Sequence, residues 1–274
     1  NMYRMKAGIY INKKHVSENK PYLDRIKSDL EISGINCKVV YGLNDLEGIE
    51  VLFVLGGDGT ILTVASACAK FGIKILGINR GHLGFLTEFQ PEQIDEAIKL
   101  VCSGNYTVIS RNMLEVVSGN NFYHALNDAV IQRSTSGNSF SNTVDLRAEI
   151  DGSTVDNYTA DGIIVSTPTG STAYSLSAGG SILTPDINAF IMTPVCAHSL
   201  HSRPVVYNDN SVLKIYPLSG STPLNLIVDG TVVGELGKED TVVIKKSDYY
   251  VEFITRGEKD FFNKLSVKLN IWSK

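Results

Sequence analysis

A continuous apolar run that breaks on glycines constrains the fold of this chain more than any other feature. Residues 51–55 read V-L-F-V-L and are followed at once by G-G-D-G-T at residues 56–60. Such a run is typical of a strand buried on both faces, as in a parallel sheet. The segment from Thr60 to Ala67 then predicts a helix, which Gly72 would end. Strand, glycine turn and helix start together predict an α/β domain with a phosphate site.

The glycine turn suits an anion for physical reasons. Glycine lets a backbone approach a ligand closely, and the free N–H groups and dipole of the following helix attract negative charge. The turn is neither of two familiar phosphate loops. No Lys-Ser/Thr pair ends it, as a Walker A loop requires, and the last position of G-x-G-x-x-G counted from Gly57 is Leu62. We therefore expect a phosphate-binding turn of another kind.

Asp58 places a carboxylate among these phosphate-binding groups. It would be useful there as a base that takes a proton from an attacking hydroxyl, or as a ligand of Mg²⁺ that screens the phosphates. The alternative is that Asp58 only caps the helix. The spacing favours the functional interpretation and leaves the cap open.

Composition limits the class of protein. A chain of 274 residues can bury a large core and suggests two domains. Hydrophobic content of 43% with 20% charged residues is ordinary for a soluble globular protein. The net charge is −4 and no basic cluster exceeds a short pair, which argues against a nucleic-acid partner. No apolar stretch reaches membrane-spanning length and no signal pattern opens the chain, so we expect no membrane partner.

Four scattered cysteines, with no C-x-x-C among them, are typical of reduced thiols in a cytoplasmic protein. No histidine stands at ligand spacing from them, so we expect no structural metal.

Residues 1–105 alternate between strand and helix patterns. Strands are expected at Met5–Ile11, Cys37–Tyr41, Val51–Leu55 and Lys74–Ile78, with helices beginning near Ser17, Thr60 and Pro91. This alternation predicts an α/β N-terminal domain with a parallel, doubly wound sheet.

Residues 106–255 have a different sequence pattern, in which pairs of predicted strands flank turn signals. Hairpins are expected at 113–126, 145–158 and 225–236, and further strands at Thr241–Ile244 and Tyr250–Ile254. We therefore expect a mostly antiparallel, β-sandwich-like C-terminal domain. The apolar pattern of the tail, about 256–274, is compatible with its packing back on the first domain.

A second candidate site lies at residues 159–180. A short buried strand, Ile163–Val165, leads into a loop dense in hydroxyls and glycine. Such a loop suits ribose, phosphate or adenine edges, and the ring of Tyr174 could stack on a base. Asp161 could accept hydrogen bonds from ribose hydroxyls or an exocyclic amine. The alternative is an ordinary loop with Tyr174 in the core.

Two other acidic positions allow a structural and a functional interpretation. Asn127-Asp128 interrupts apolar strands, as a bulge or turn does, yet could also bind a sugar diol. Asp229-Gly230 is more typical of a hairpin turn than of a ligand contact.

These motifs occur together and in order: G-G-D-G-T at 56–60, G-H-L-G-F at 81–85, L-N-D at 126–128, and the block 159–180. Over nearly its whole length the chain resembles bacterial NAD kinases, which phosphorylate the adenosine 2′-hydroxyl of NAD to make NADP. Lipid kinases and phosphofructokinases carry blocks similar to the first one. The block T-P-T-G-S-T-A-Y-S-L-S-A-G-G at 167–180 is far more specific.

The resemblance implies that NAD is bound between the two domains and across a subunit contact, with Asp58 as general base. Phe85 would lie near the adenine, and Asn127 with Asp128 would bind the diol of the nicotinamide ribose. The full set of substrate-binding residues would be Gly57, Gly59, Phe85, Asn127, Asp128, Asp161, Thr172, Ala173, Tyr174, Ser175, Leu176, Ser177 and Asp229.

The family is usually homo-oligomeric, as a dimer or tetramer, uses ATP or in some members polyphosphate, and needs Mg²⁺ or another divalent metal; the resemblance names no metal ligand here. In this sequence Asp128 stands where many members have Glu, Ala197 replaces a common Pro, and Thr159 replaces a charged or larger residue. None of these changes removes a group that the chemistry requires.

Two rival functions remain at this point. A lipid kinase would share the first glycine block, but should show an exposed apolar entrance or a basic face, and the sequence has neither. A non-catalytic nucleotide sensor would bind NAD without needing Asp58.

Overall fold

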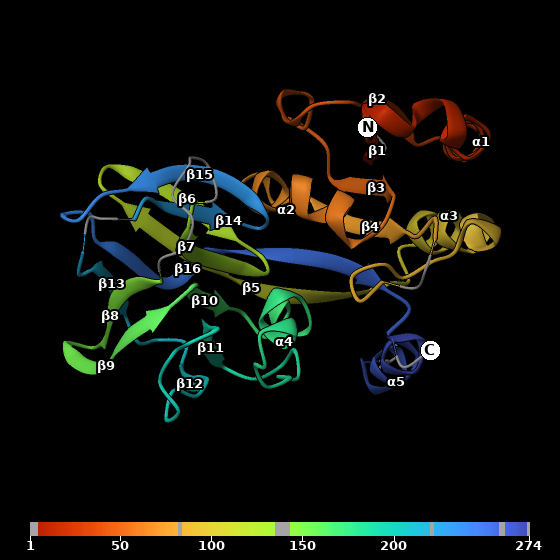
Figure 1. The fold of residues 1–274 in the computed structure, drawn as a ribbon. Helices are drawn as coiled ribbons and strands as arrows, with labels where there is room; N and C mark the ends of the chain where they lie inside the picture. Colours follow the sequence, from red (N-terminus) through yellow and green to blue (C-terminus); the bar gives the residue numbers. More distant parts are fainter. Residues whose placement is uncertain (1–4, 82–83, 135–142, 220–221, 258–260, 273–274) are drawn as a thin grey trace. The chain divides into compact units, whose positions relative to one another are not determined.

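The computed structural model describes residues 5–81, 84–134, 143–219, 222–257 and 261–272 (Figure 1). Residues 271 and 272 are described by their backbone only. His82 and Leu83 of the G-H-L-G-F motif lie outside the described residues. The chain forms two compact units: unit 1 is Asn1–Arg111 with Tyr250–Lys274, and unit 2 is Asn112–Tyr249. The chain passes from one unit to the other within two long strands, β5 (Thr107–Ser118) and β16 (Val242–Thr255).

Unit 1 is built on a parallel sheet in the order β2-β1-β3-β4. Its strands are β1 (Lys6–Ile11), β2 (Asn36–Val40), β3 (Val51–Leu55) and β4 (Lys74–Ile78), and the end of β16 pairs in parallel with β4. All five residues of β3 are buried, as the apolar run predicted. The expected parallel sheet is confirmed.

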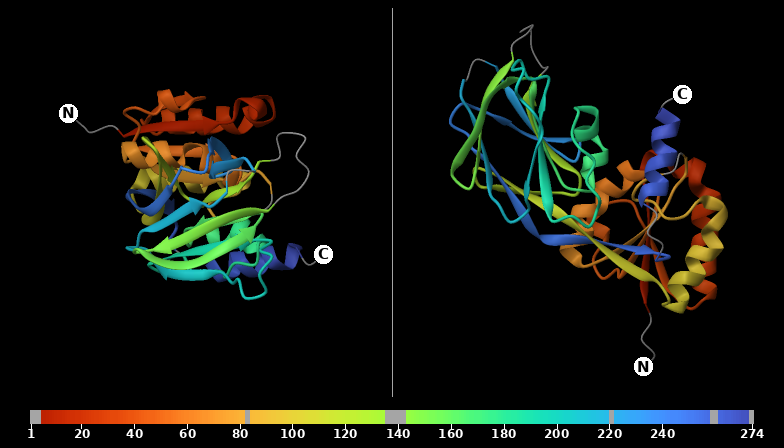
Figure 2. Two further views of the ribbon diagram at one scale, coloured as in Figure 1. Left: turned by 60° about the vertical axis from the view of Figure 1, so that its left-hand side comes forward. Right: turned by 90° about the horizontal axis from the view of Figure 1, so that it is seen from below.

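Helices cover both faces of this sheet, so it is doubly wound (Figures 1 and 2). One core cluster joins α1 (Val16–Ile32) and α3 (Ile94–Ser103) to the strands. Ile61 of α2 (Asp58–Phe71) instead packs against Gly77 of β4 on the other face. Glycines in the left-handed conformation end α2 at Gly72, as expected, and α3 at Gly104. Short 3₁₀ turns complete the unit: η1 (Lys13–His15), η2 (Leu43–Asp45) and η3 (Pro91–Gln93).

Unit 2 is a sandwich of two sheets. One runs β12-β11-β10-β7-β14-β15 with every pairing antiparallel, and the other contains β16-β13-β8-β9 with the β5-β6 hairpin. The strands are β6 (Asn121–Ala125), β7 (Asp128–Arg133), β8 (Val144–Ile150), β9 (Ser153–Ala160), β10 (Gly162–Ser166), β11 (Ala189–Val195), β12 (Val205–Asn208), β13 (Leu213–Pro217), β14 (Leu224–Val228) and β15 (Thr231–Leu236). Side chains from both sheets form one core cluster, which confirms the sandwich-like prediction.

Two short helical segments, η4 (Gly170–Thr172) and α4 (Tyr174–Ser177), follow β10. The chain ends in α5 (Phe261–Trp272), part of unit 1.

One strand differs from the sequence-based expectation. The two strands expected at 241–244 and 250–254 are a single strand, β16, so the predicted break was wrong. Three polar residues between them have partners in neighbouring segments, which supports the extended backbone there. Lys245 pairs with Glu115 at 2.9 Å, Lys246 with Asp209 at 2.6 Å, and the Ser247 hydroxyl lies 3.0 Å from the His124 ring.

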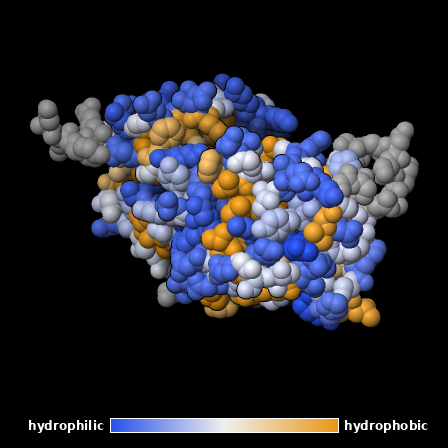
Figure 3. All heavy atoms as spheres, turned by 90° about the vertical axis from the view of Figure 1, so that its left-hand side faces the viewer, coloured by the Kyte–Doolittle hydropathy of each residue, from blue (hydrophilic) through white to orange (hydrophobic). Residues whose placement is uncertain are grey.

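Among the described residues, no helix combines the length and the apolar character that crossing a membrane requires. On the face shown in Figure 3, polar side chains predominate and apolar ones lie in small groups among them.

Candidate active site

Asp58 is the first residue of α2, and its carboxylate is turned away from the helix. The N-cap of α2 is Gly57, so no side chain of the N-cap residue accepts a hydrogen bond from the first turn. The Asp58 Oδ2 atom accepts the Phe85 N–H at 2.8 Å, and Oδ1 accepts the Leu86 N–H at 3.1 Å. The interpretation of Asp58 as a mere helix cap is therefore wrong. The carboxylate is oriented by the backbone of the loop that follows β4.

Gly84 allows this loop to lie against the carboxylate. A Cβ atom at residue 84 would overlap Asp58 Oδ1 and crowd the Thr87 hydroxyl, which itself accepts the Gly84 N–H at 3.2 Å. Only glycine fits such a close approach. The second glycine of G-H-L-G-F therefore serves Asp58, a role that linear spacing could not show because 26 residues separate the two.

Helix α5 reaches the same loop. The Lys268 Nζ atom lies 3.5 Å from Asp58 Oδ2 and 4.2 Å from the centre of the Phe85 ring. The Phe261 ring packs against Phe85 with 6.1 Å between centroids. Sequence reasoning assigned no role to Lys268, although Lys264 and Lys268 share the four-residue spacing that places two side chains on one helix face.

In unit 2 the carboxylate of Asp229 organises the turn between β6 and β7. It accepts the N–H groups of Leu126 at 2.7 Å, Asn127 at 2.8 Å and Asp128 at 3.1 Å. Asp229 and Gly230 also form the β14–β15 hairpin turn, both with positive φ, as their spacing predicted. Asp229 thus forms part of one hairpin turn with its backbone, and its side chain fixes the turn at residues 126–128.

Asp128, the first residue of β7, is buried beside this carboxylate. Burial, and then the negative charge of Asp229, raise the pKa of Asp128 to about 7. Burial also raises the pKa of Asp229, while its three N–H donors pull that pKa back down. The three N–H donors favour the charged form of Asp229, whereas burial and that charge favour the neutral form of Asp128.

The hydroxyl-rich loop after β10 is docked on the same turn. The Thr167 hydroxyl donates to the Leu126 carbonyl at 2.6 Å, and the Thr167 N–H donates to the Asn127 carbonyl at 2.9 Å. A Cβ atom at Gly170 would overlap the Asn127 carbonyl. Asn127, Asp128, Asp229 and the start of the 167–180 block are therefore brought together.

Several hydroxyls of this loop are used internally. The Thr172 hydroxyl donates to the Thr169 carbonyl at 3.2 Å, and the buried Ser175 hydroxyl lies 2.9 Å from that of Thr193. Tyr174, in contrast, is 42% exposed, so the interpretation of Tyr174 as a core residue is wrong. Ala173 and Leu176 are half-buried and Ser177 is exposed.

Asp161 lies apart from this group. It precedes β10, whereas the loop follows β10 from Thr167, so six steps along the strand separate them by roughly 20 Å at about 3.3 Å per residue. Its carboxylate pairs with Arg133 at 3.2 Å, a partner that sequence reasoning did not identify.

The comparisons with known proteins agree with this geometry. The ATP-NAD kinase N-terminal domain model matches residues 10–106, and the ATP-NAD kinase C-terminal domain model matches residues 126–256. The chain belongs to the NAD kinase family. The resemblance drawn from the motifs is thereby confirmed, and with it the assignment as an enzyme that acts as an NAD kinase.

Curated relatives named NAD kinase match over most of their length. The protein of Caldanaerobacter subterraneus subsp. tengcongensis is 39% identical over 92% of this chain and 88% of its own. That of Clostridium botulinum strain Loch Maree is 40% identical over 97% of each chain.

Solved structures share the fold. A crystal structure of yeast NADH kinase complexed with NADH matches with a TM-score of 0.85 and 27% identity, over 100% of this chain and 90% of that one. A crystal structure of an NAD kinase from Archaeoglobus fulgidus in complex with ATP matches with a TM-score of 0.77 over 96% and 98% of the chains; at 24% identity it supports the fold alone.

Proposed function

We propose that this NAD kinase transfers the γ-phosphoryl group of ATP to the adenosine 2′-hydroxyl of NAD, with Asp58 as general base. The 2′-hydroxyl proton passes to the Asp58 carboxylate as the bond from the 2′-oxygen to the γ-phosphorus forms. The bond from that phosphorus to the oxygen bridging to the β-phosphate breaks, which leaves NADP and ADP. ATP as donor is supported by the family, whose two domain models are both described as ATP-NAD kinase.

The observation that carries the role of Asp58 is the way its carboxylate is held. Two N–H donors fix its orientation, yet they use only two of roughly four acceptor positions of a carboxylate. Its side chain is 27% exposed, so a substrate hydroxyl has access to a remaining position. A general base must reach the proton it takes at hydrogen-bond distance, and a fixed carboxylate with a free acceptor position meets this requirement.

Unit 2 supplies the groups that we assign to NAD. A protonated Asp128 can both donate and accept hydrogen bonds, as a ribose diol does, and the Asn127 amide next to it can do the same. The exposed ring of Tyr174 is available for stacking on a base. Thr172, Ala173, Ser175, Leu176 and Ser177 would shape this surface, and Gly57, Gly59 and Phe85 would do so beside Asp58.

We propose that a divalent cation such as Mg²⁺ binds together with the nucleotide phosphates. In the described ranges no three His, Cys, Asp or Glu side chains come together as a metal-binding cluster. Mg²⁺ is commonly held by one or two carboxylates together with substrate phosphates. When bound it would supply charge neutralisation at those phosphates, and we derive no step through it.

The test is NADP formation from NAD, ATP and Mg²⁺, followed with a coupled NADP-specific dehydrogenase, in the wild type and in Asp58→Asn. We expect turnover in the wild type and a loss of about 10²-fold to 10⁴-fold in the variant. Asp95→Asn is the matched control, because Asp95 is also at the start of a helix but pairs with Arg25 on the surface. A normal thermal shift with NAD would show that Asp58→Asn still folds and binds.

The donor is tested in the same assay. Turnover with polyphosphate and none with ATP would keep the base and change the donor. Tight NAD binding with no turnover from either donor would instead favour a nucleotide sensor, and wild-type activity in Asp58→Asn would refute the base assignment.

We also infer a homo-oligomer, a dimer or a tetramer, with a site shared between subunits. Because Asp161 lies at the opposite end of β10 from the hydroxyl-rich loop, a second subunit is the simplest way to bring an Asp161 carboxylate to the same NAD. Mixing inactive Asp58→Asn with inactive Asp161→Asn should then restore part of the activity. No recovery in subunits shown to exchange would contradict a shared site.

A further inference from the structure

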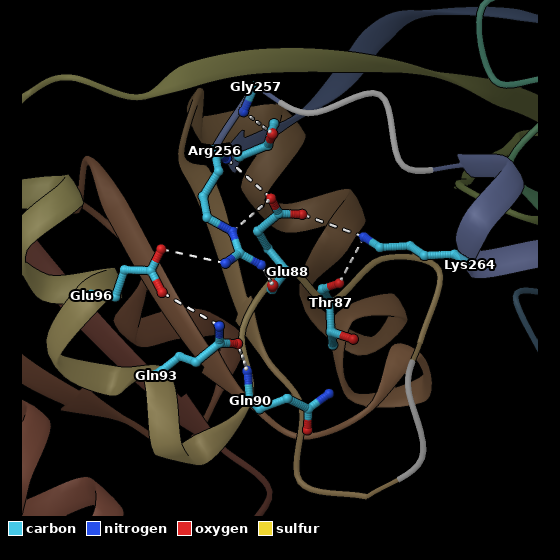
Figure 4. Close-up of polar contacts among 9 residues, drawn as sticks. Thr87, Glu88, Gln90, Gln93, Glu96, Arg256, Gly257 and Lys264 are labelled. Carbon is cyan, nitrogen blue, oxygen red and sulfur yellow. Dashed lines mark hydrogen bonds and ion pairs between the residues drawn. The ribbon is translucent and has the colours of Figure 1, made fainter. Parts of the chain in front are cut away.

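Helix α5 packs against residues 85–88, the loop whose N–H groups donate to the Asp58 carboxylate. The Lys264 ammonium donates to the Thr87 carbonyl at 3.1 Å and contacts Glu88 Oε2 at 3.3 Å (Figure 4). Lys264 is only 13% exposed, so this pair is shielded more than an ordinary surface ion pair. Together with the packing of Phe261 on Phe85, these contacts fix the first turns of α5 against residues 85–88.

The segment just before α5 is fastened to the same loop. The Arg256 N–H donates to Glu88 Oε1 at 3.0 Å, and the Arg256 guanidinium donates to the Glu88 carbonyl at 3.2 Å and to Glu96 at 3.3 Å (Figure 4). The guanidinium also lies over the Phe89 ring, 5.0 Å from its centre. Glu88 thus contacts both Arg256 and Lys264. Several contacts, and not one, therefore define the position of α5 within unit 1.

This anchoring places Lys268, one helical turn after Lys264, at the catalytic carboxylate. Its side chain is 18% exposed, and its ammonium lies over the face of Phe85. The 3.5 Å separation from Asp58 Oδ2 exceeds the 2.7–2.9 Å that is typical of a charge-assisted hydrogen bond. The ammonium therefore stands beside Asp58 without being saturated by it, and has three N–H donors in all.

We propose that Lys268 contacts the phosphoryl group that is transferred, which rests on the proposed role of Asp58. A base lies about 2.6–3.2 Å from the hydroxyl oxygen it deprotonates, and that oxygen lies about 3–3.5 Å from the phosphorus it attacks. The oxygens of the phosphoryl group then fall within a few ångströms of the Asp58 carboxylate, which is where the Lys268 ammonium lies. The long, flexible lysine side chain can cover the remaining distance.

Electrostatic repulsion also favours a cation such as Lys268 at the transferred phosphoryl group. A carboxylate and a phosphoryl group that approach the same hydroxyl repel one another, and phosphoryl transfer is accelerated chiefly by positioning and by cations at the transferring oxygens. The protein carries a net charge of −4 and no large basic cluster, so a single well-placed ammonium matters more than in a basic protein. Lys268 supplies that charge from the last helix of the chain.

The test compares Lys268→Met and Lys268→Arg with Lys99→Met, which removes an exposed lysine of α3. We expect Lys268→Met to lower kcat about 10²-fold to 10³-fold with the KM for NAD little changed, as for the loss of one donor at a developing anion. Lys268→Arg should recover part of the rate because it keeps the charge, and Lys99→Met should equal the wild type. Wild-type kcat in Lys268→Met would overturn the proposal.

A second measurement separates contact with the phosphoryl group from mere pairing with Asp58. The affinity for ATP is measured by calorimetry in Asp58→Asn and in the double variant Asp58→Asn with Lys268→Met. If Lys268 contacts the phosphoryl group, the double variant binds ATP several-fold more weakly; equal affinities would overturn the proposal. If Asp58→Asn keeps its turnover while Lys268→Met loses it, the base assignment fails and the role of Lys268 stands.

Discussion

The two units use the same device on two carboxylates and obtain different results. Asp58 and Asp229 each accept backbone N–H groups from a loop distant in the sequence, which fixes the side chain and the loop together. Asp58 accepts two such groups and has a loosely placed ammonium beside it, whereas Asp229 accepts three. The role proposed for Asp58 uses this difference, because its carboxylate keeps acceptor positions for a substrate hydroxyl, whereas Asp229 uses more of its positions on the turn.

The buried neighbour of Asp229 completes the contrast. Burial and the neighbouring charge of Asp229 both raise the pKa of Asp128, so a second anion beside Asp229 is disfavoured. Asp58 has a cation at 3.5 Å and partial access to solvent. Burial and the charge of Asp229 thus favour a carboxylic acid at Asp128.

The largest expected effect is on activity, and it distinguishes Asp58 from Asp229. We expect Asp58→Asn to reduce kcat about 10²-fold to 10⁴-fold while the thermal midpoint changes by only a few degrees, because the amide oxygen can still accept one N–H. Steady-state kinetics and thermal unfolding on the same preparations measure both quantities. Loss of stability equal to that of an Asp229 variant would remove the distinction between the two sites.

Asp229→Ala should act on stability instead. Three N–H groups of residues 126–128 lose their acceptor, so we expect the free energy of unfolding to fall by about 3 kcal/mol. Urea unfolding checks this, with Asp240→Ala as control, since the Asp240 side chain accepts a single N–H in an exposed turn. An unchanged unfolding midpoint would mean that water replaces the carboxylate without cost.

Gly84→Ala tests whether the loop must lie against Asp58. The added methyl group would overlap the Asp58 carboxylate, so either the loop or the carboxylate has to move. We expect a loss of about 1–3 kcal/mol in stability and a further loss of kcat, since small misplacements at a reacting group are expensive. Gly81→Ala is the matched control in the same loop, because no atom of the described residues lies within 4 Å of the position of its Cβ. Equal behaviour of the two variants would contradict the close packing.

The smallest expected effect concerns pH. Folding raises the pKa of Asp128 from 3.8 to about 7, so the folded state keeps a proton that the unfolded state releases between these values. The stabilisation from this proton is therefore complete below about pH 4 and is lost as pH rises through about 7. Asp128→Asn should flatten this decline, by about 1–3 kcal/mol between pH 4 and 8 in urea unfolding. An unchanged slope would show that Asp128 is ionised in the folded protein.

Much of the fold could be predicted because local patterns and tertiary structure agree. The buried run at 51–55, the glycines that end α2 and α3, and the Asp-Gly hairpin turns each carry their signal within a few residues. The break predicted within β16 was wrong because Lys245, Lys246 and Ser247 are polar in the sequence, while their partners come from other strands and a loop. Hydrophobic patterns do not reveal such pairings.

The sequence by itself determined the α/β unit, the antiparallel unit, the position of Asp58 at the start of a helix and the family of the chain. Only the tertiary structure decided that the Asp58 carboxylate faces the loop after β4, that Asp229 anchors the turn at Asn127, and that Lys268 lies beside Asp58. The physical reason is the range of the forces involved. Strand and helix patterns arise from neighbouring residues, whereas the orientation of the Asp58 carboxylate depends on donors and a cation that folding brings from 27 to 210 residues away.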